Sequence, residues 1–140
     1  MKLDETDVFI SFHEDMTINV NELYSKLNLK FRTTMQHNQW QRSQLTLNDC
    51  HAQDIKKSKV FLCCLTKKYF ECIEKRKELI YALRLDKKIL VLNYDRVNMN
   101  DTNLDSDEFN LENVEQIQFD DYDLIEQSIE NILKVKCIFI

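Results

Sequence analysis

The chain has 140 residues, of which 44% are hydrophobic and 31% charged, and it carries a formal net charge of −5. This length predicts one compact domain over residues 1–140, either complete or part of a longer parent protein. The apolar content excludes a disordered chain, and the negative charge argues against a nucleic-acid partner, because phosphate binding draws on clustered Lys and Arg.

The sequence favours a cytoplasmic protein. Its start, MKLDETD, is acidic where a signal peptide would be basic and then apolar, and no apolar run approaches the roughly 20 residues of a membrane helix. The cysteine count of five is odd, and Cys63 and Cys64 are adjacent within an apolar run. They are therefore predicted to be free core residues rather than disulfide partners.

Two further cysteines raise other possibilities. Cys50 and His51 are neighbours that cannot both face one ion from a helix, so no metal site is predicted. Cys137 begins the C-terminal sequence CIFI, which has the outline of a prenylation box. A membrane partner is expected only if Cys137 is prenylated, and an apolar tail packed on the last helix explains the same residues.

Glycine and proline are both absent. Left-handed backbone positions, which glycine usually occupies, must therefore fall to Asn and Asp, which tolerate that conformation best among the other residues. Asn-rich loops are expected, such as the one over 93–113.

Strands and helices alternate along the chain. Short β-branched and aromatic runs predict buried strands over 7–12, 29–33, 59–65, 88–92 and 117–119. Helices are predicted from a capping box at Asn19 and Glu22, over 47–57 with Thr46 and Asp49 at capping spacing, over 68–84, and after Asp123 and Glu126; residues 34–46 form a long loop.

The 68–84 segment shows an apolar stripe at helical spacing, which is expected to face the sheet. The stripe consists of Tyr69, Cys72, Ile73, Arg76, Leu79, Ile80 and Leu83. The alternation of elements predicts an α/β fold with a parallel sheet covered on both faces. Ligands bind such sheets at the carboxyl ends of the strands, so function is expected just after Phe12, Leu65 and Leu92.

Motifs at these strand ends are similar to those of the TIR (Toll/interleukin-1 receptor) domain family. The run DVFISF followed by His13, Glu14 and Asp15 resembles the family's opening box. The middle of the chain resembles the family's next boxes through Ile55, Ser58, Lys59, Thr66, Tyr69, Cys72, Glu78, Ala82 and the run KILVL. The resemblance implies a flavodoxin-like three-layer sandwich with a five-stranded parallel sheet.

The resemblance also implies a chemistry. Many TIR domains hydrolyse or cyclise NAD+, which is a substrate rather than a cofactor, and the family's catalytic glutamate matches Glu78. A carboxylate beside the ribose stabilises the oxocarbenium-like charge that develops as nicotinamide leaves, and the product is linear or cyclic ADP-ribose. On an ideal helical wheel Glu78 lies off the apolar stripe, so a solvated carboxylate among Glu71, Glu74, Lys75 and Lys77 is the competing interpretation.

Substrate-binding positions carry over as Phe12, His13, Asp15, Trp40 and Thr66. An aromatic ring at Phe12 could stack on a base, or it could simply pack in the core. His13 stands where the family more often has Arg, which weakens a phosphate contact at neutral pH. Trp40 lies in the loop that in TIR domains closes over the site and contacts other TIR domains, and a lone Trp is also a common interface anchor.

Three functions are therefore open. The first is an NAD+-consuming TIR domain with Glu78 as the essential carboxylate, activated by self-association in immune or cell-death signalling. The second is a non-catalytic adaptor that assembles with other TIR domains through the Trp40 loop and the last helix. The third is a nucleoside deoxyribosyltransferase, a group of similar architecture that also shows a glutamate followed by Tyr and Ala, as Glu78, Tyr81 and Ala82 are here.

Overall fold

The computed structural model describes residues 6–35, 49–94 and 114–138, without the side chains of 49–51 and 135–138. The strands are β1 (Thr6–Ser11), β2 (Thr33–Met35), β3 (Ser58–Leu65), β4 (Lys88–Asn93) and β5 (Glu115–Gln118). The helices are α1 (Thr17–Leu27), α2 (Asp49–Lys57), α3 (Lys67–Glu71), α4 (Ile73–Arg84) and α5 (Tyr122–Ile138), with a 3₁₀ turn η1 (Glu14–Met16) before α1.

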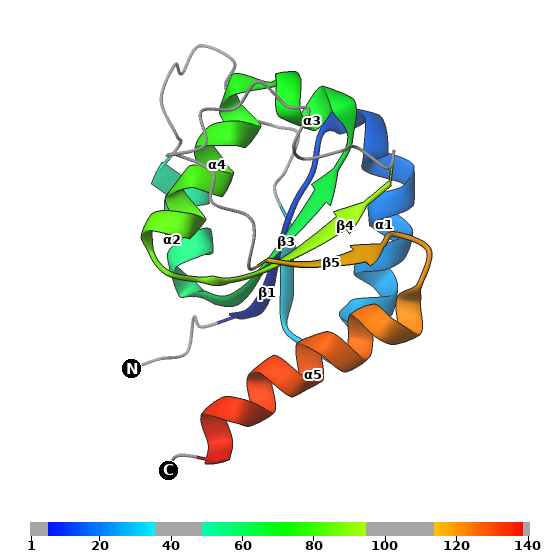
Figure 1. The fold of residues 1–140 in the computed structure, drawn as a ribbon, viewed down its shortest axis with the longest axis vertical. Coiled ribbons are helices and arrows are strands. Elements are labelled where there is room, and N and C mark those ends of the chain that lie inside the picture. The colour runs from blue at the N-terminus through cyan, green and yellow to red at the C-terminus, as the bar shows by residue number, and fades with distance from the viewer. Residues whose placement is uncertain (1–5, 36–48, 95–113, 139–140) are drawn as a thin grey trace.

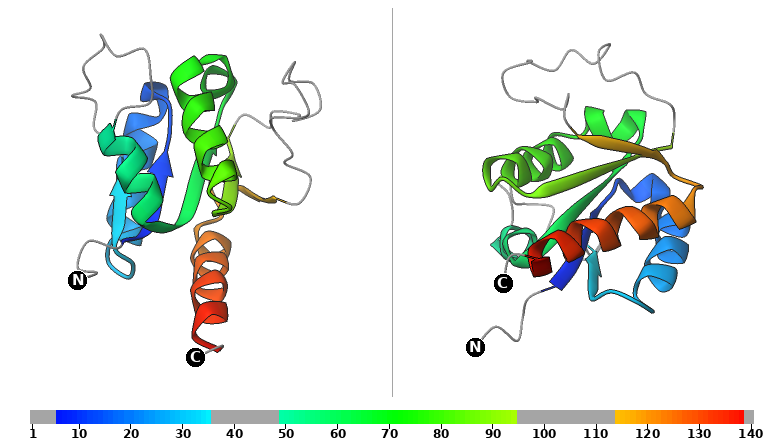
Figure 2. Two further views of the ribbon diagram at one scale, coloured as in Figure 1. Left: turned by 90° about the vertical axis from the view of Figure 1, so that its left-hand side faces the viewer. Right: turned by 60° about the horizontal axis from the view of Figure 1, so that its bottom comes forward.

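The five strands form one parallel sheet in the order β2-β1-β3-β4-β5. Helices cover both faces, with α4 on one side of the sheet and α1 and α5 on the other (Figures 1 and 2). This arrangement confirms the predicted flavodoxin-like α/β sandwich. Because the chain leaves β1 toward one edge of the sheet and later builds β3 to β5 toward the other, strand order reverses between β1 and β3.

Both faces of the central strands are buried, which explains their continuous apolar sequences. In β1, Val8 and Ile10 face the cluster packed by α1 and α5, whereas Phe9 faces the cluster packed by α2, α3 and α4. The ring of Phe9 stacks on that of Phe61 in β3, with centroids 5.7 Å apart. Odd-numbered residues of β1 and β3 therefore belong to the α4 side of the sheet, and Ser11 is one of them.

Several element boundaries differ from the sequence prediction. Helix α1 begins at Thr17 because η1 leads directly into it, so the capping box at Asn19 is wrong. The second strand shares only Thr33 with the predicted 29–33, because a turn continues beyond α1 and leaves Leu29 90% exposed. At the start of α5 the cap comes from Asp121, whose Oδ1 accepts from the Leu124 N–H.

The predicted 68–84 helix is broken at Cys72, whose backbone is extended at φ −89° and ψ 118°. The break changes the rotational phase of everything after it. Ile73, which was predicted to face the sheet, is 60% exposed. The buried residues of α4 are instead Lys75, Glu78, Leu79 and Ala82, which follow the i, i+3, i+4, i+7 spacing of one helical face.

Asp86 shows how this chain makes a left-handed turn without glycine. It has φ 57°, and it is the one residue with positive φ in the described ranges. The Asp86 N–H donates to the Leu83 carbonyl and the Lys87 N–H donates to the Ala82 carbonyl, which is the hydrogen-bond pattern of a Schellman motif at the end of α4. The expectation that Asp or Asn takes such positions is confirmed here.

We expect Asp86→Gly to raise the free energy of unfolding by about 0.5 kcal/mol, because glycine adopts positive φ without steric cost and its greater freedom in the unfolded chain cancels only part of the gain. Asp86→Val should lower the free energy by about 1 to 2 kcal/mol, since its branched side chain clashes in that conformation. Urea unfolding measures both, and a Val variant as stable as wild type would contradict the assignment.

Candidate functional site

A group of polar side chains lies buried under the carboxyl ends of β1 and β3, where the strand order reverses. Ser11 is the last residue of β1 and pairs in register with Cys63 of β3. Tyr69 from α3 and Glu78 from α4 reach the same place. Ser11 and Tyr69 are completely buried, and Glu78 is 1% exposed.

Hydrogen bonds join these side chains into a chain. Ser11 Oγ donates to Glu78 Oε1 at 2.8 Å. Ser11 Oγ also lies 2.7 Å from Tyr69 Oη. Because a serine hydroxyl has one hydrogen, the Tyr69 hydroxyl must donate to Ser11 when Ser11 donates to Glu78. The carboxylate is therefore the final acceptor of a relay from α3 through β1 to α4.

Lys75 completes the group with a buried ion pair. Its Nζ lies 3.1 Å from Glu78 Oε2, and the two side chains are 8% and 2% exposed. The sequence interpretation placed Glu78 off the buried stripe and Lys75 among solvated charges, and both placements are wrong. The break at Cys72 rotates α4 so that these two residues face inward.

The neighbours of Glu78 on the sheet side are held neutral. Burial raises the pKa of the Cys63 thiol to about 12, and the charge of Glu78 adds to this effect. Burial also raises the pKa of Tyr69 well above its usual value, with Cys63 and Glu78 contributing. The site thus presents a carboxylate in surroundings with little water, where electrostatic interactions are stronger than in solution.

Two residues predicted to bind substrate, Phe12 and Thr66, make contacts that support the fold. Phe12 follows Ser11 and turns to the opposite face of the sheet, where it packs in the cluster under α1 and α5 at 2% exposure. This is the core packing that the sequence left open. Thr66 is buried and caps α3, with its Oγ1 accepting from the Tyr69 N–H at 3.1 Å.

His13 and Asp15 lie between β1 and α1, with His13 just before η1 and Asp15 within it. The Nδ1 of His13 accepts from the Asp15 N–H at 3.3 Å and caps η1. Asp15 Oδ2 pairs with Lys68 Nζ at 2.9 Å, which links this segment to α3 and lowers the pKa of the Asp15 carboxyl. The structure places both residues at the carboxyl edge of the sheet.

Trp40 and Thr46 lie outside the described residues. Cys137 falls within α5, but its side chain is not among those described. Cys63 and Cys64 are free and buried, as predicted.

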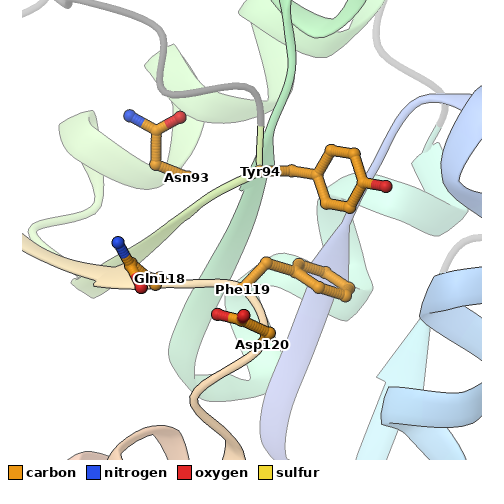
Figure 3. Close-up of a pocket in the computed structure, with 5 residues that line it drawn as sticks. All are labelled: Asn93, Tyr94, Gln118, Phe119 and Asp120. Atoms are coloured by element: carbon orange, nitrogen blue, oxygen red, sulfur yellow. The ribbon is translucent and has the colours of Figure 1, made fainter.

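A cavity of about 150 Å³ opens at the carboxyl ends of β4 and β5 (Figure 3). It is lined by Asn93, Tyr94, Gln118, Phe119 and Asp120. The rings of Tyr94 and Phe119 meet edge to face with centroids 5.7 Å apart, and the Tyr94 N–H donates to the Leu65 carbonyl at the end of β3. The sequence indicated a functional edge after Leu92 but did not identify these side chains.

Within 6–35, 49–94 and 114–138, no three His, Cys, Asp or Glu side chains are grouped as a metal site would require. No helix in those ranges is long and apolar enough to cross a membrane.

A flavodoxin-like sheet with a buried carboxylate below the strand-order reversal defines the class of this protein as an α/β domain with a candidate site at the carboxyl edge. The model of the family described as "TIR domain" matches residues 8–133, so the chain belongs to the TIR domain family. This match favours the first two functions above over a nucleoside deoxyribosyltransferase.

The fold is also similar to the TIR domains in the structure of the activated Roq1 resistosome, which directly recognises the pathogen effector XopQ. The sequences are 23% identical and the TM-score is 0.55, with the alignment covering 66% of this chain and 58% of that chain. No curated protein sequence matches the chain. At this identity the likeness supports the fold alone.

Sequence reasoning missed Ser11 and Lys75 as site residues. The spacing carries a signal only once α4 is known to restart after Cys72: Lys75 and Glu78 then share the i, i+3, i+4, i+7 pattern with Leu79 and Ala82, on one buried helical face. Ionisable residues are rarely buried on an apolar helical face unless they pair with an opposite charge.

The capping role of Thr66 predicts a measurable loss on substitution. Thr66→Ala should lower the free energy of unfolding by about 1 kcal/mol, because the Tyr69 N–H loses its acceptor at the start of a buried helix. Thr66→Ser keeps the hydroxyl and should remain close to wild type. Equal urea midpoints for the Ala and Ser variants would contradict this role.

The state of Cys63 predicts low thiol reactivity. Burial raises the pKa of the Cys63 thiol to about 12, so almost none of it is ionised at pH 8, and the buried side chain is also shielded from reagents. Iodoacetamide at pH 8 should therefore leave Cys63 and Cys64 unmodified in the folded protein, while the half-buried Cys72 reacts and urea exposes all three. Peptide mass spectrometry reads this out, and labelling of Cys63 as fast as Cys72 would contradict it.

Proposed function

We propose that this TIR domain cleaves NAD+ with Glu78 as the catalytic carboxylate. The observation that carries the proposal is the position of Glu78: buried, hydrogen-bonded by Ser11 and paired with Lys75 under the carboxyl ends of β1 and β3. Open α/β sheets bind ligands at this reversal point of strand order.

The chemistry needs one group from the protein at the reacting centre. As the bond between the ribose carbon and the nicotinamide nitrogen breaks, its electron pair neutralises the cationic ring, and neutral nicotinamide leaves. Positive charge then develops on the ribose, and the Glu78 carboxylate would stabilise that charge. Water adds to the ribose carbon and loses a proton to give ADP-ribose, or an adenine nitrogen adds to it instead and gives a cyclic product.

Activation by self-association is part of the same proposal. The Glu78 side chain is 2% exposed in the single chain, so a ribose must gain access through a rearrangement of the elements around it. Contact with further TIR domains would supply the free energy for that change. The cytoplasm is the proposed compartment, because Cys63 and Cys64 are free thiols and this compartment keeps thiols reduced.

The test is a chromatogram of NAD+, nicotinamide, ADP-ribose and cyclic ADP-ribose after incubation at rising protein concentration and with a crowding agent. Wild type should release nicotinamide, with specific activity that rises with concentration. Glu78→Gln should reduce release by about 100-fold or more, because it keeps the shape of the side chain but removes the charge and one of the two acceptor oxygens. Glu74→Gln, at an exposed carboxylate one turn before Glu78 on α4, is the matched control and should keep full activity.

A non-catalytic adaptor is the second candidate. Both oxygens of the Glu78 carboxylate already accept hydrogen bonds, one from Ser11 and one from Lys75. A purely structural network would have the same arrangement, which favours an adaptor. Such an adaptor leaves NAD+ intact under all the conditions above. Its self-association, measured by light scattering, would not change in a folded Glu78→Gln variant, and that pair of results would overturn the enzymatic proposal.

A further inference from the structure

The pairing of Lys75 with Glu78 is set by the geometry of α4. The two residues are three positions apart, so their side chains lie on the same helical face, and Nζ meets Oε2 at 3.1 Å. Lys75 as a whole is 6% exposed. Surface lysines extend their ammonium groups into water, whereas this one remains inside the protein beside a carboxylate.

Glu78 is held from two directions by different elements. Ser11 from β1 donates to Oε1, and Lys75 from α4 donates to Oε2. Fixing both oxygens defines the plane of the carboxylate with respect to the end of β1. A carboxylate with only one of these donors could rotate about its last torsion.

The surroundings make the charge of Lys75 important. Burial disfavours an ionised carboxylate, and a positive group within hydrogen-bond distance favours it. Tyr69 of α3 and Cys63 of β3 also face Glu78, and both remain neutral because burial raises their pKa values. The ammonium of Lys75 is a positive charge in direct contact with this carboxylate.

We propose that Lys75 is a positioning residue, which keeps Glu78 ionised and fixes the orientation of its carboxylate toward the end of β1. The catalytic part of this inference rests on the proposed function. Lys75 acts through Glu78 and is not required to touch the substrate. A neutral carboxylic acid at position 78 would stabilise a developing ribosyl cation far less than a carboxylate does.

The test uses Lys75→Gln, which keeps a hydrogen-bond donor but carries no charge. The acid limb of the pH profile of kcat/KM for nicotinamide release should move to higher pH by about one to three units. The variant should then lose activity at acid pH where wild type keeps it, and it should approach wild type near pH 9. A purely structural role would lower activity equally at every pH, and that result would overturn the proposal.

Two further variants sharpen the comparison. Lys75→Arg restores the positive charge and should return the acid limb to its wild-type position. Lys77→Gln removes a charge from the same helix outside the described ion pair and should leave the profile unchanged. If Lys77→Gln shifts the profile as far as Lys75→Gln does, the effect is a general one of net charge and the proposal fails.

A measurement without substrate separates this inference from the proposed function. Carbon-13 NMR of the Glu78 side-chain carboxyl in the wild-type chain should show it ionised at pH 6, and Lys75→Gln should raise the pH at which the carboxyl becomes protonated. A wild-type carboxyl that is protonated at pH 6 overturns the role of Lys75 even if the variant does not fold. If the carboxyl titrates as expected but no NAD+ is consumed, the proposed function fails while the ionising role of Lys75 stands.

Discussion

The buried ion pair between Lys75 and Glu78 is the interaction on which the candidate site depends. Taking two charges out of water is unfavourable unless each finds good hydrogen-bond geometry, and the removal of one partner of such a pair commonly costs about 3 to 5 kcal/mol. Here the helix supplies the ammonium and β1 supplies the Ser11 hydroxyl. The local structure must therefore hold α4 at one rotation and one distance from the sheet.

The break at Cys72 is what makes that rotation possible. A continuous helix from 68 to 84 would keep the stripe that begins at Tyr69 in phase and would turn Ile73 and Arg76 toward the sheet. One extended residue lets α3 bury Tyr69 while α4 restarts with Lys75 and Glu78 inward. The capping hydroxyl of Thr66 sets where α3 begins, so a short segment between β3 and α4 determines the geometry of the site.

The fold was predictable because each central strand is marked by its own short apolar run in the sequence. Runs such as 59–65 are apolar on both faces, and their alternation with helices permits few arrangements other than a parallel sheet. The predicted boundaries that were wrong depended on tertiary contacts. Asn19 does not cap α1, because η1 leads into a helix that already begins at Thr17. The second strand begins later than predicted, because an exposed turn at Leu29 comes before it.

The candidate site was predictable only in part. Glu78 came from resemblance to the TIR family, whereas helical periodicity alone placed it off the buried face. Lys75 could not be separated from the solvated charges around it without the phase change at Cys72. Phe12 and Thr66 occupy the positions that the resemblance gave, but the structure uses them for core packing and for helix capping.

The turn at Asp86 has a wider consequence for a chain that contains no glycine. Every residue here carries a Cβ atom, so the denatured chain has fewer accessible backbone conformations than one of the same length with glycine at some positions, and folding loses less entropy at those positions. This smaller loss of entropy applies wherever another chain would have glycine. The steric cost of a side chain at positive φ arises, in the described residues, only at Asp86.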